Sequence, residues 1–217
     1  MTECHLNPLA DRPILIASGN IHKHKEICRA LDLPSGKVLT PLDIEETAGP
    51  APDPVEDGDS LLENAIIKAK AFSKWSGMPA LADDTGLFVD DLGGNPGVHS
   101  ARYAGENASF SDNVEKLLRE LSAVPESSNE SHFSCVLVLC DKDEIILSVE
   151  GTCPGHITES PRGSDGFGYD PVFIPLNETQ TFSEMTPDEK DQLSHRGQAV
   201  RKFANLYKEI LTTGAKS

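Results

Sequence analysis

The strongest candidates for chemistry in this chain are two adjacent carboxylates, Asp83 and Asp84, which end the apolar run 80–82. Because side chains alternate along a strand, one acid can turn inward while the other faces a cleft. Charges at the end of a buried run are costly unless a cation compensates them. Carboxylate oxygens suit Mg²⁺, which binds one or two carboxylates together with water and substrate phosphates. The pair predicts a Mg²⁺ site; the structural alternative is that both acids merely cap a turn.

Basic residues are scarce and placed beside turns. The chain of 217 residues has 19 Lys and Arg against 35 Asp and Glu, a formal net charge of −16. Six cations nevertheless lie beside turns or helix starts that carry Gly, Ser or Thr: Lys23, Lys25, Lys68, Arg102, Lys190 and Arg196. This placement predicts a cationic pocket for a phosphorylated small molecule. The net charge of −16 argues against generic binding to nucleic acid and anionic membranes, which draws on clustered Lys and Arg.

A phosphate-binding turn is predicted near the amino terminus. The apolar run 14–17 leads through Ser18, Gly19 and Asn20 into a helical pattern over residues 21–31. A strand, a small-residue turn and a helix place backbone N–H groups and the positive end of the helix dipole at the turn. Lys23 in the first helical turn opposes that dipole, which favours a role as anion ligand. The alternative is a plain connection with a solvated lysine.

The glycine-rich segment 161–171 is suited to binding a flat ring. Phe167 stands between Gly166 and Gly168 and can project from a flexible backbone to stack on a base. Asp170 is either part of this site or a turn former. Further along, Ser194 is the expected N-cap of the last helix, which places His195 and Arg196 in its first turn.

Strand and helix patterns alternate around these motifs. We expect two short strands at 81–83 and 87–89 joined by a turn at Thr85 and Gly86. The other expected strands are residues 14–17, 37–40, 133–139, 145–149 and 172–174. The expected helices are 21–31, 60–76, 109–121 and two opened by Thr186 and Ser194. Residues 1–12 are expected to be a flexible tail and 48–59 an exposed loop. One domain spans 1–217, with a lobe boundary near 122–131.

The composition bounds the compartment. No apolar run approaches the roughly 20 residues that cross a bilayer, and the first residues lack the basic and then apolar order of a signal peptide. We expect a cytoplasmic protein. The five cysteines contain no Cys-x-x-Cys pair, so neither a disulfide framework nor a zinc site is indicated.

Six motifs in order give the chain a family resemblance from residue 14 to the last helix. They are Ser18-Gly19-Asn20-Ile21-His22-Lys23, Glu63-Asn64-Ala65 with Lys68, Ala82-Asp83-Asp84-Thr85-Gly86-Leu87, Gly93-Gly94-Asn95-Pro96-Gly97 with Ser100-Ala101-Arg102-Tyr103, Phe167-Gly168-Tyr169-Asp170, and Ser194-His195-Arg196-Gly197. In these motifs the sequence resembles the inosine/xanthosine triphosphate pyrophosphatases, which hydrolyse non-standard purine nucleoside triphosphates.

The resemblance implies an elongated α/β fold of two lobes with a mixed sheet, a nucleotide cleft between the lobes and a homodimer. It implies that Asp84 is general base and metal ligand and that Thr85 contacts substrate. The triphosphate would be gripped by Ser18, Gly19, Asn20, Ile21, His22 and Lys23. The base and phosphate chain would be held by Phe167, Gly168, Tyr169, Asp170, Lys190, His195 and Arg196.

For the second Mg²⁺ ligand the resemblance favours Glu46, because the family has a Glu at this spacing before a Gly and Glu46 precedes Gly49 by three residues. Glu45 and Glu56 are alternatives, since the 48–59 loop is extended. The expected reaction is Mg²⁺-assisted attack of water on the α-phosphorus of ITP, dITP or XTP, which gives the nucleoside monophosphate and pyrophosphate. The alternatives are a pyrophosphatase for another modified nucleotide and a nucleotide-sensing module without turnover.

Overall fold

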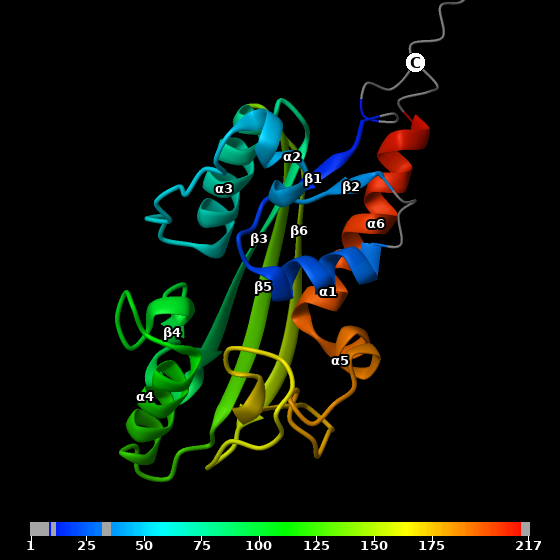
Figure 1. The fold of residues 1–217 in the computed structure, drawn as a ribbon. Coiled ribbons are helices and arrows are strands. Elements are labelled where there is room, and N and C mark those ends of the chain that lie inside the picture. The colour runs from blue at the N-terminus through cyan, green and yellow to red at the C-terminus, as the bar shows by residue number, and fades with distance from the viewer. Residues whose placement is uncertain (1–8, 10–11, 32–35, 214–217) are drawn as a thin grey trace, which may run out of the picture. The chain divides into compact units, whose positions relative to one another are not determined.

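The computed structural model describes residue 9, residues 12–31 and residues 36–213 (Figure 1). The tail expected at residues 1–12 lies outside the described residues except at positions 9 and 12. In chain order the elements are β1 Ile14–Ile16, α1 Ile21–Leu31, β2 Val38–Leu39, α2 Pro41–Ala48, α3 Leu61–Ser76, β3 Ala80–Val89, η1 Asp90–Leu92, β4 Pro96–Gly97, η2 Ser100–Arg102, α4 Phe110–Ser122, β5 Glu130–Asp141, β6 Glu144–Ile157, η3 Asp170–Val172, β7 Phe173–Pro175, α5 Pro187–Leu193 and α6 His195–Thr213.

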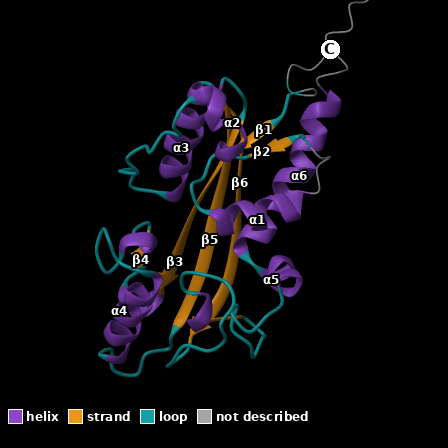
Figure 2. Cartoon of the chain, viewed as in Figure 1, coloured by secondary structure: helices purple, strands orange, loops and turns teal. Residues whose placement is uncertain are grey.

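The strands form one seven-stranded mixed sheet in the order β2-β1-β3-β5-β6-β7, with β4 added to β3 (Figure 2). β1 is parallel to β2 and β3. β4 is antiparallel to β3, and β7 is antiparallel to β6. Parallel neighbours need a crossover, which α1 and α3 provide, whereas antiparallel neighbours can be joined by short turns. The mixed α/β fold expected from the resemblance is confirmed.

The chain divides into two compact units. Unit 1 comprises residues 1–84, 136–149 and 199–217, and unit 2 comprises residues 85–135 and 150–198. Within unit 1, all three residues of β1 are buried. Figure 1 shows α3 and α6 on opposite sides of the strands of this unit. A strand covered on both faces reads as a continuous apolar run, which is why residues 14–17 show no alternation.

Unit 2 has an aromatic core of its own. The ring centroid of Phe133 lies 4.7 Å from that of Phe173 and 6.2 Å from that of Phe182. Helix α4 packs Val114, Leu117 and Leu121 into the same core. The cap expected at Thr186 is present, since its side chain accepts from the N–H of Glu189 in α5, and Ser109 likewise accepts from that of Asp112 in α4. These caps satisfy N–H groups that a helix start leaves without a partner.

One sequence prediction about the carboxylate pair is wrong. Residues 80–89 form a single strand, β3, instead of two short strands with a turn at Thr85 and Gly86. Strand β4 approaches here, and Leu87 is opposite Gly97. A Cβ atom at Gly86 would lie 2.6 Å from the carbonyl oxygen of Gly97. The glycine therefore permits a close backbone approach within the sheet and does not make a turn.

Helix α2 was not anticipated. Its start combines Pro41 at the first helical position with a capping box between Thr40 and Asp43, whose carboxylate accepts from the Thr40 N–H over 2.7 Å. The segment is short and its residues are mostly exposed, so no apolar periodicity indicates a helix here.

Within the described part of the chain, no helix is both long and apolar enough to cross a membrane.

The cysteine environments generate a first prediction. Burial raises the pKa of Cys153 to about 12, so its reactive thiolate forms only as the pH approaches that value. At pH 8 we expect iodoacetamide to leave Cys153 unlabelled in the native protein and to label it after unfolding in urea, as measured by peptide mass spectrometry. Exposed Cys28 is the internal comparison. Labelling of native Cys153 as fast as that of Cys28 would contradict the prediction.

Candidate active site

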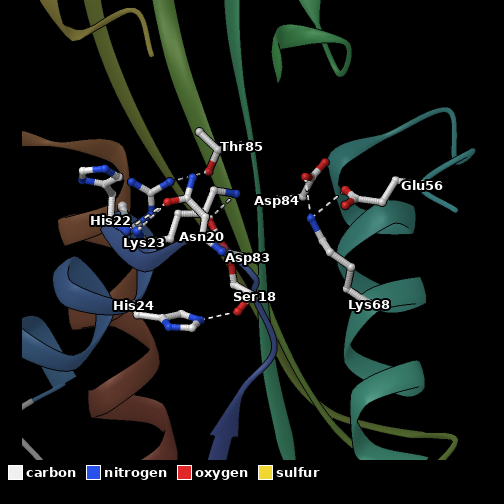
Figure 3. Close-up of polar contacts among 11 residues, drawn as sticks. Ser18, Asn20, His22, Lys23, His24, Glu56, Lys68, Asp83, Asp84 and Thr85 are labelled. Atoms are coloured by element: carbon white, nitrogen blue, oxygen red, sulfur yellow. Dashed lines mark hydrogen bonds and ion pairs between the residues drawn. The ribbon is translucent and has the colours of Figure 1, made fainter. Parts of the chain in front are cut away.

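The turn between β1 and α1 in unit 1 is closed by its own side chains (Figure 3). The N–H of Asn20 donates to Ser18 Oγ over 3.1 Å. Asn20 Oδ1 in turn accepts from the N–H of His22 over 2.9 Å and more weakly from that of Lys23 over 3.5 Å. The Asn20 side-chain oxygen thus caps the helix by accepting from backbone N–H donors that an anion could also use. A phosphate at this turn would therefore compete with, or rearrange, the Asn20 cap.

His24 also stabilises this turn, a role that the sequence analysis did not identify. Its side chain is buried, and its Nε2 contacts the backbone carbonyl of Ser18 (Figure 3). A carbonyl only accepts, so Nε2 is the donor in this contact. The buried Nδ1 has no hydrogen-bond partner among the described residues. A histidine at this helical position carries no sequence signal, because its role depends on a carbonyl six residues earlier.

Asp83 faces α1. Its side chain is 0% exposed, and its Oδ2 lies 3.0 Å from Nζ of Lys23. Figure 3 shows this pair beside the Ser18–Asn20 turn. Lys23 therefore has a structural partner as well as its expected role toward an anion. The buried carboxylate fixes the lysine where the helix begins.

Asp84, the next residue of β3, faces α3 instead. Lys68 Nζ donates to Asp84 Oδ1 over 2.8 Å and to Glu56 Oε2 over 2.7 Å. One ammonium group thus bridges two carboxylates that come from a strand and from the loop before α3 (Figure 3). Asp84 Oδ2 is buried and accepts no hydrogen bond from any described residue. This oxygen is available to a further cation or proton.

Electrostatics in this cluster favour proton transfer. Burial raises the pKa of Asp84 above its ordinary value and outweighs the opposing attraction of Lys68 and Lys23. For Lys68, burial acts to lower the pKa, but Asp84, Asp83 and Glu56 raise it overall. Lys68 is accordingly a fixed positive charge at neutral pH. A carboxylate with a raised pKa is a better proton acceptor than an ordinary one.

The two metal ligands expected from sequence differ in placement. Asp84 is buried, whereas Glu46 is exposed on α2. Glu56, one of the alternatives, lies in the Asp84–Lys68 cluster with a side chain 34% exposed. The loop reaches α3 because the N–H of Gly58 donates to Asn64 Oδ1 over 2.9 Å. Among the described residues, no three His, Cys, Asp or Glu side chains form a complete ligand set, but Mg²⁺ requires only one or two.

The remaining predicted residues belong to unit 2, where Asp170 organises the Phe167 loop. Asp170 Oδ2 accepts from the N–H of Phe167 over 2.8 Å and from Lys190 Nζ over 2.7 Å. A Cβ atom on Gly166 would lie 2.2 Å from that same oxygen, and the φ of Gly166 is +79°. Glycine is therefore required next to Phe167.

Two buried cations lie over the Phe167 ring. Lys190 Nζ is 4.9 Å and the Arg196 guanidinium carbon 5.6 Å from the ring centroid. Arg196 also donates through Nη2 to Thr85 Oγ1 over 3.2 Å. The ring of His195 stacks on Phe133 with centroids 4.5 Å apart. Unit 2 thus brings Thr85, Phe167, Lys190, His195 and Arg196 into one connected group.

Tyr169 and Arg102 have different surroundings. Tyr169 is buried and donates its hydroxyl to the carbonyl of Ser100 over 3.0 Å. This bond ties the Phe167–Asp170 segment to η2. Arg102 in η2 contacts Glu106, with Nε 3.7 Å from Oε1, and His99. Arg102 thus contacts residues near it in the chain, whereas Tyr169 links two separate segments through its hydroxyl.

Comparison with known proteins identifies the class. The family model described as the Ham1 family matches residues 14–206, and this chain belongs to that family. It is similar to a dITP/XTP pyrophosphatase from Geobacillus kaustophilus, with 43% identity over 200 residues that cover 92% of this chain and 96% of that protein. A HAM1 protein from Coxiella burnetii has a solved structure with a TM-score of 0.81 and 37% identity, covering 91% of this chain and 99% of that one.

A second solved structure is that of a nucleoside-triphosphatase / dITP/XTP pyrophosphatase from Mycobacterium abscessus. Its TM-score is 0.68 at 38% identity, and the match covers 88% of this chain and 98% of that one. The resemblance inferred from six motifs is confirmed, and the match extends over almost the whole chain.

The Lys68 cluster generates a second prediction. We expect Lys68→Met to lower the free energy of unfolding of the metal-free protein by about 3–5 kcal/mol, because it leaves buried Asp84 without its compensating charge. Urea unfolding at pH 7 measures this. Adding Asp84→Asn should recover part of the loss, since the uncompensated charge is then removed.

Lys74→Met on the same helix is the matched control. Lys74 pairs with Asp143 at the surface, where both side chains are more than half exposed. Exposed pairs contribute little, so this variant should unfold at an unchanged urea concentration. Equal effects of the two lysine substitutions would contradict the buried-bridge interpretation.

Proposed function

We propose that this protein hydrolyses non-standard purine nucleoside triphosphates, ITP, dITP and XTP, to the nucleoside monophosphate and pyrophosphate, and so removes them from the nucleotide pool. The observation that carries the proposal is Asp84, a buried carboxylate with a raised pKa and an oxygen without a hydrogen-bond partner among the described residues. Family membership and the names of the relatives support the same reaction.

A divalent cation fits the unit 1 cluster. Lys68 already holds Asp84 and Glu56 around one positive charge, and Asp84 Oδ2 remains available beside it. We assign Mg²⁺ to Asp84 and Glu56, with Glu46 as the rival second ligand. When bound, Mg²⁺ would neutralise phosphate charge and stabilise the charge that develops in the reaction. The protein residues supply positioning and proton transfer.

The proposed proton transfer uses Asp84. As the oxygen of a water molecule bonds to the α-phosphorus, Asp84 accepts the proton that this water loses. The bond from the α-phosphorus to the oxygen that bridges to the β-phosphorus breaks, and pyrophosphate leaves. Lys23 and Lys68 lie beside the two carboxylates, so we assign them to the phosphate oxygens whose negative charge grows in this step.

Base recognition is assigned to unit 2. Phe167 offers a ring for stacking, and His195 and Arg196 offer donors to a purine that carries an oxo group at position 6. Guanine adds an amino group at position 2. If that group is buried without a partner, it costs about 1–3 kcal/mol, which is enough for strong discrimination. The substrate-binding roles expected from the sequence are all part of this proposal.

Two further features belong to the proposal. The protein acts as a homodimer, as the family resemblance implies, and size-exclusion chromatography with light scattering tests this. It acts in the cytoplasm, where nucleoside triphosphates are found. Cys28, Cys140 and Cys153 are thiols, which is compatible with a reducing compartment.

The reaction generates a third prediction. In the presence of Mg²⁺, the wild-type protein should release pyrophosphate from ITP, XTP and dITP and little from GTP or ATP. Asp84→Asn should lower kcat by at least about 10²-fold, because the water loses its proton acceptor. Calorimetry with ITP checks that the variant still binds nucleotide. Nucleotide binding by an inactive wild-type protein would instead support the sensing module.

The metal assignment generates a fourth prediction. We expect Glu56→Gln to raise the Mg²⁺ concentration that half-saturates pyrophosphate release by about ten-fold or more, because the substitution removes a charged ligand. Glu46→Gln, a matched change at an exposed position, should leave the Mg²⁺ titration unchanged. A shift in the Glu46 variant alone would return the metal site to α2.

A further inference from the structure

Phe110, the first residue of α4, is an exposed aromatic side chain that none of the six motifs includes. It is 47% exposed. Along α4, the buried residues Val114, Leu117 and Leu121 form the apolar face. Phe110 continues that face by one turn, because it lies four residues before Val114 and seven before Leu117. The apolar stripe of α4 therefore runs beyond the core and ends on a half-exposed ring.

The ring that Phe110 meets is Phe167. Their centroids are 6.1 Å apart and their planes are inclined by 47°. This separation is within the range of interacting aromatic pairs. The two rings do not stack flat on each other, so together they form a corner. Phe167 is itself only partly buried, so both rings keep surface for a ligand.

The chemistry around this corner selects a planar, polar ring as its occupant. Lys190 and Arg196 lie over Phe167, and both are almost fully buried. Lys190 is held by Asp170, and Arg196 donates to Thr85. An aliphatic segment of another protein would cover the rings but would bring no acceptor atom toward these two cations. A nucleobase supplies a π face for the rings and acceptor atoms for the cations.

We propose that Phe110 is a substrate-binding residue: it contacts the purine base of the nucleotide and, with Phe167, forms a two-ring corner that holds the base. This inference rests on the proposed function for the identity of the nucleotide. Phe110 acts on the base and not on the phosphate chain. Its loss weakens binding and leaves the chemical step unchanged.

The test compares ligands with and without a base. We expect Phe110→Ala to raise KM for ITP about five- to twenty-fold, within the range for loss of one base–aromatic contact, with kcat changed less than about two-fold. The inhibition constant of inorganic tripolyphosphate, which has no base, should not change. Phe110→Tyr keeps the ring and should behave as wild type. Leu176→Ala removes another exposed apolar side chain of unit 2, 60% exposed, and should have no effect.

An unchanged KM in Phe110→Ala would overturn the inference. Equal weakening of ITP and tripolyphosphate would also overturn it, because a general distortion of the site would then explain the loss. Circular dichroism of the Phe110→Ala variant checks that α4 remains folded.

A second variant makes the outcome independent of turnover. Phe110→Trp places an indole in the corner, against the constant background of Trp75, the single tryptophan of the chain. Inosine 5′-monophosphate should change its fluorescence, and Leu176→Trp should not respond. If the wild-type protein releases no pyrophosphate, the proposed function fails, while the response of Phe110→Trp still decides whether this residue meets a base. If the Phe110→Trp enzyme is active but its fluorescence does not respond to the monophosphate, the inference about Phe110 is wrong while the proposed function stands.

Discussion

The structure of unit 1 depends on the burial of two negative charges at consecutive positions of β3. Asp83 and Asp84 point to opposite sides of the strand, because side chains alternate. Each acid therefore has its own direct ion pair with a different lysine. Asp83 takes Lys23 from α1, and Asp84 takes Lys68 from α3. Burial of an uncompensated carboxylate would cost several kcal/mol, so both helices are held against this strand. The same two pairings place the Ser18–Asn20 turn on one side of β3 and the Glu56 loop on the other.

Lys68 compensates the charge of Asp84 only in part. What would stabilise the fold further would here weaken Asp84 as a proton acceptor. Its Oδ1 is bonded to Lys68, while Oδ2 has no partner among the described residues and the pKa stays raised by burial. A carboxylate with both oxygens satisfied would be more stable and a weaker base. Natural sites accept such a local cost when the group must bind or take up something that the folded chain does not itself contain.

The sequence predicted what depends on local patterns and missed what depends on approach in space. The cap at Thr186 was predictable, since its bond reaches only three residues along the chain. Gly86 was misread as a turn because its purpose is set by β4, which is joined to β3 by residues that carry no strand periodicity. The contact of Glu56 with Lys68 could not be predicted from spacing, because the loop is held to α3 through the bond from Gly58 to Asn64. His24 gave no signal at all, since its partner is a backbone carbonyl.

Unit 2 also contains a buried carboxylate that is paired with a lysine, but here the carboxylate positions the neighbouring groups. There the buried carboxylate, Asp170, fixes Phe167 and Lys190, which are the residues proposed to contact the ligand. It holds the backbone of Phe167 and the ammonium of Lys190 with a single oxygen, and the lack of a Cβ at Gly166 leaves room for that oxygen. The residues of the motif therefore act together: Gly166 leaves room for the Asp170 carboxylate, which positions the Phe167 backbone and the Lys190 ammonium. The position of the Phe167 backbone consequently depends on a carboxylate that is also ion-paired with Lys190. A loop fixed in this way can leave the Phe167 ring partly exposed, and such preorganisation would favour the proposed stacking on a base.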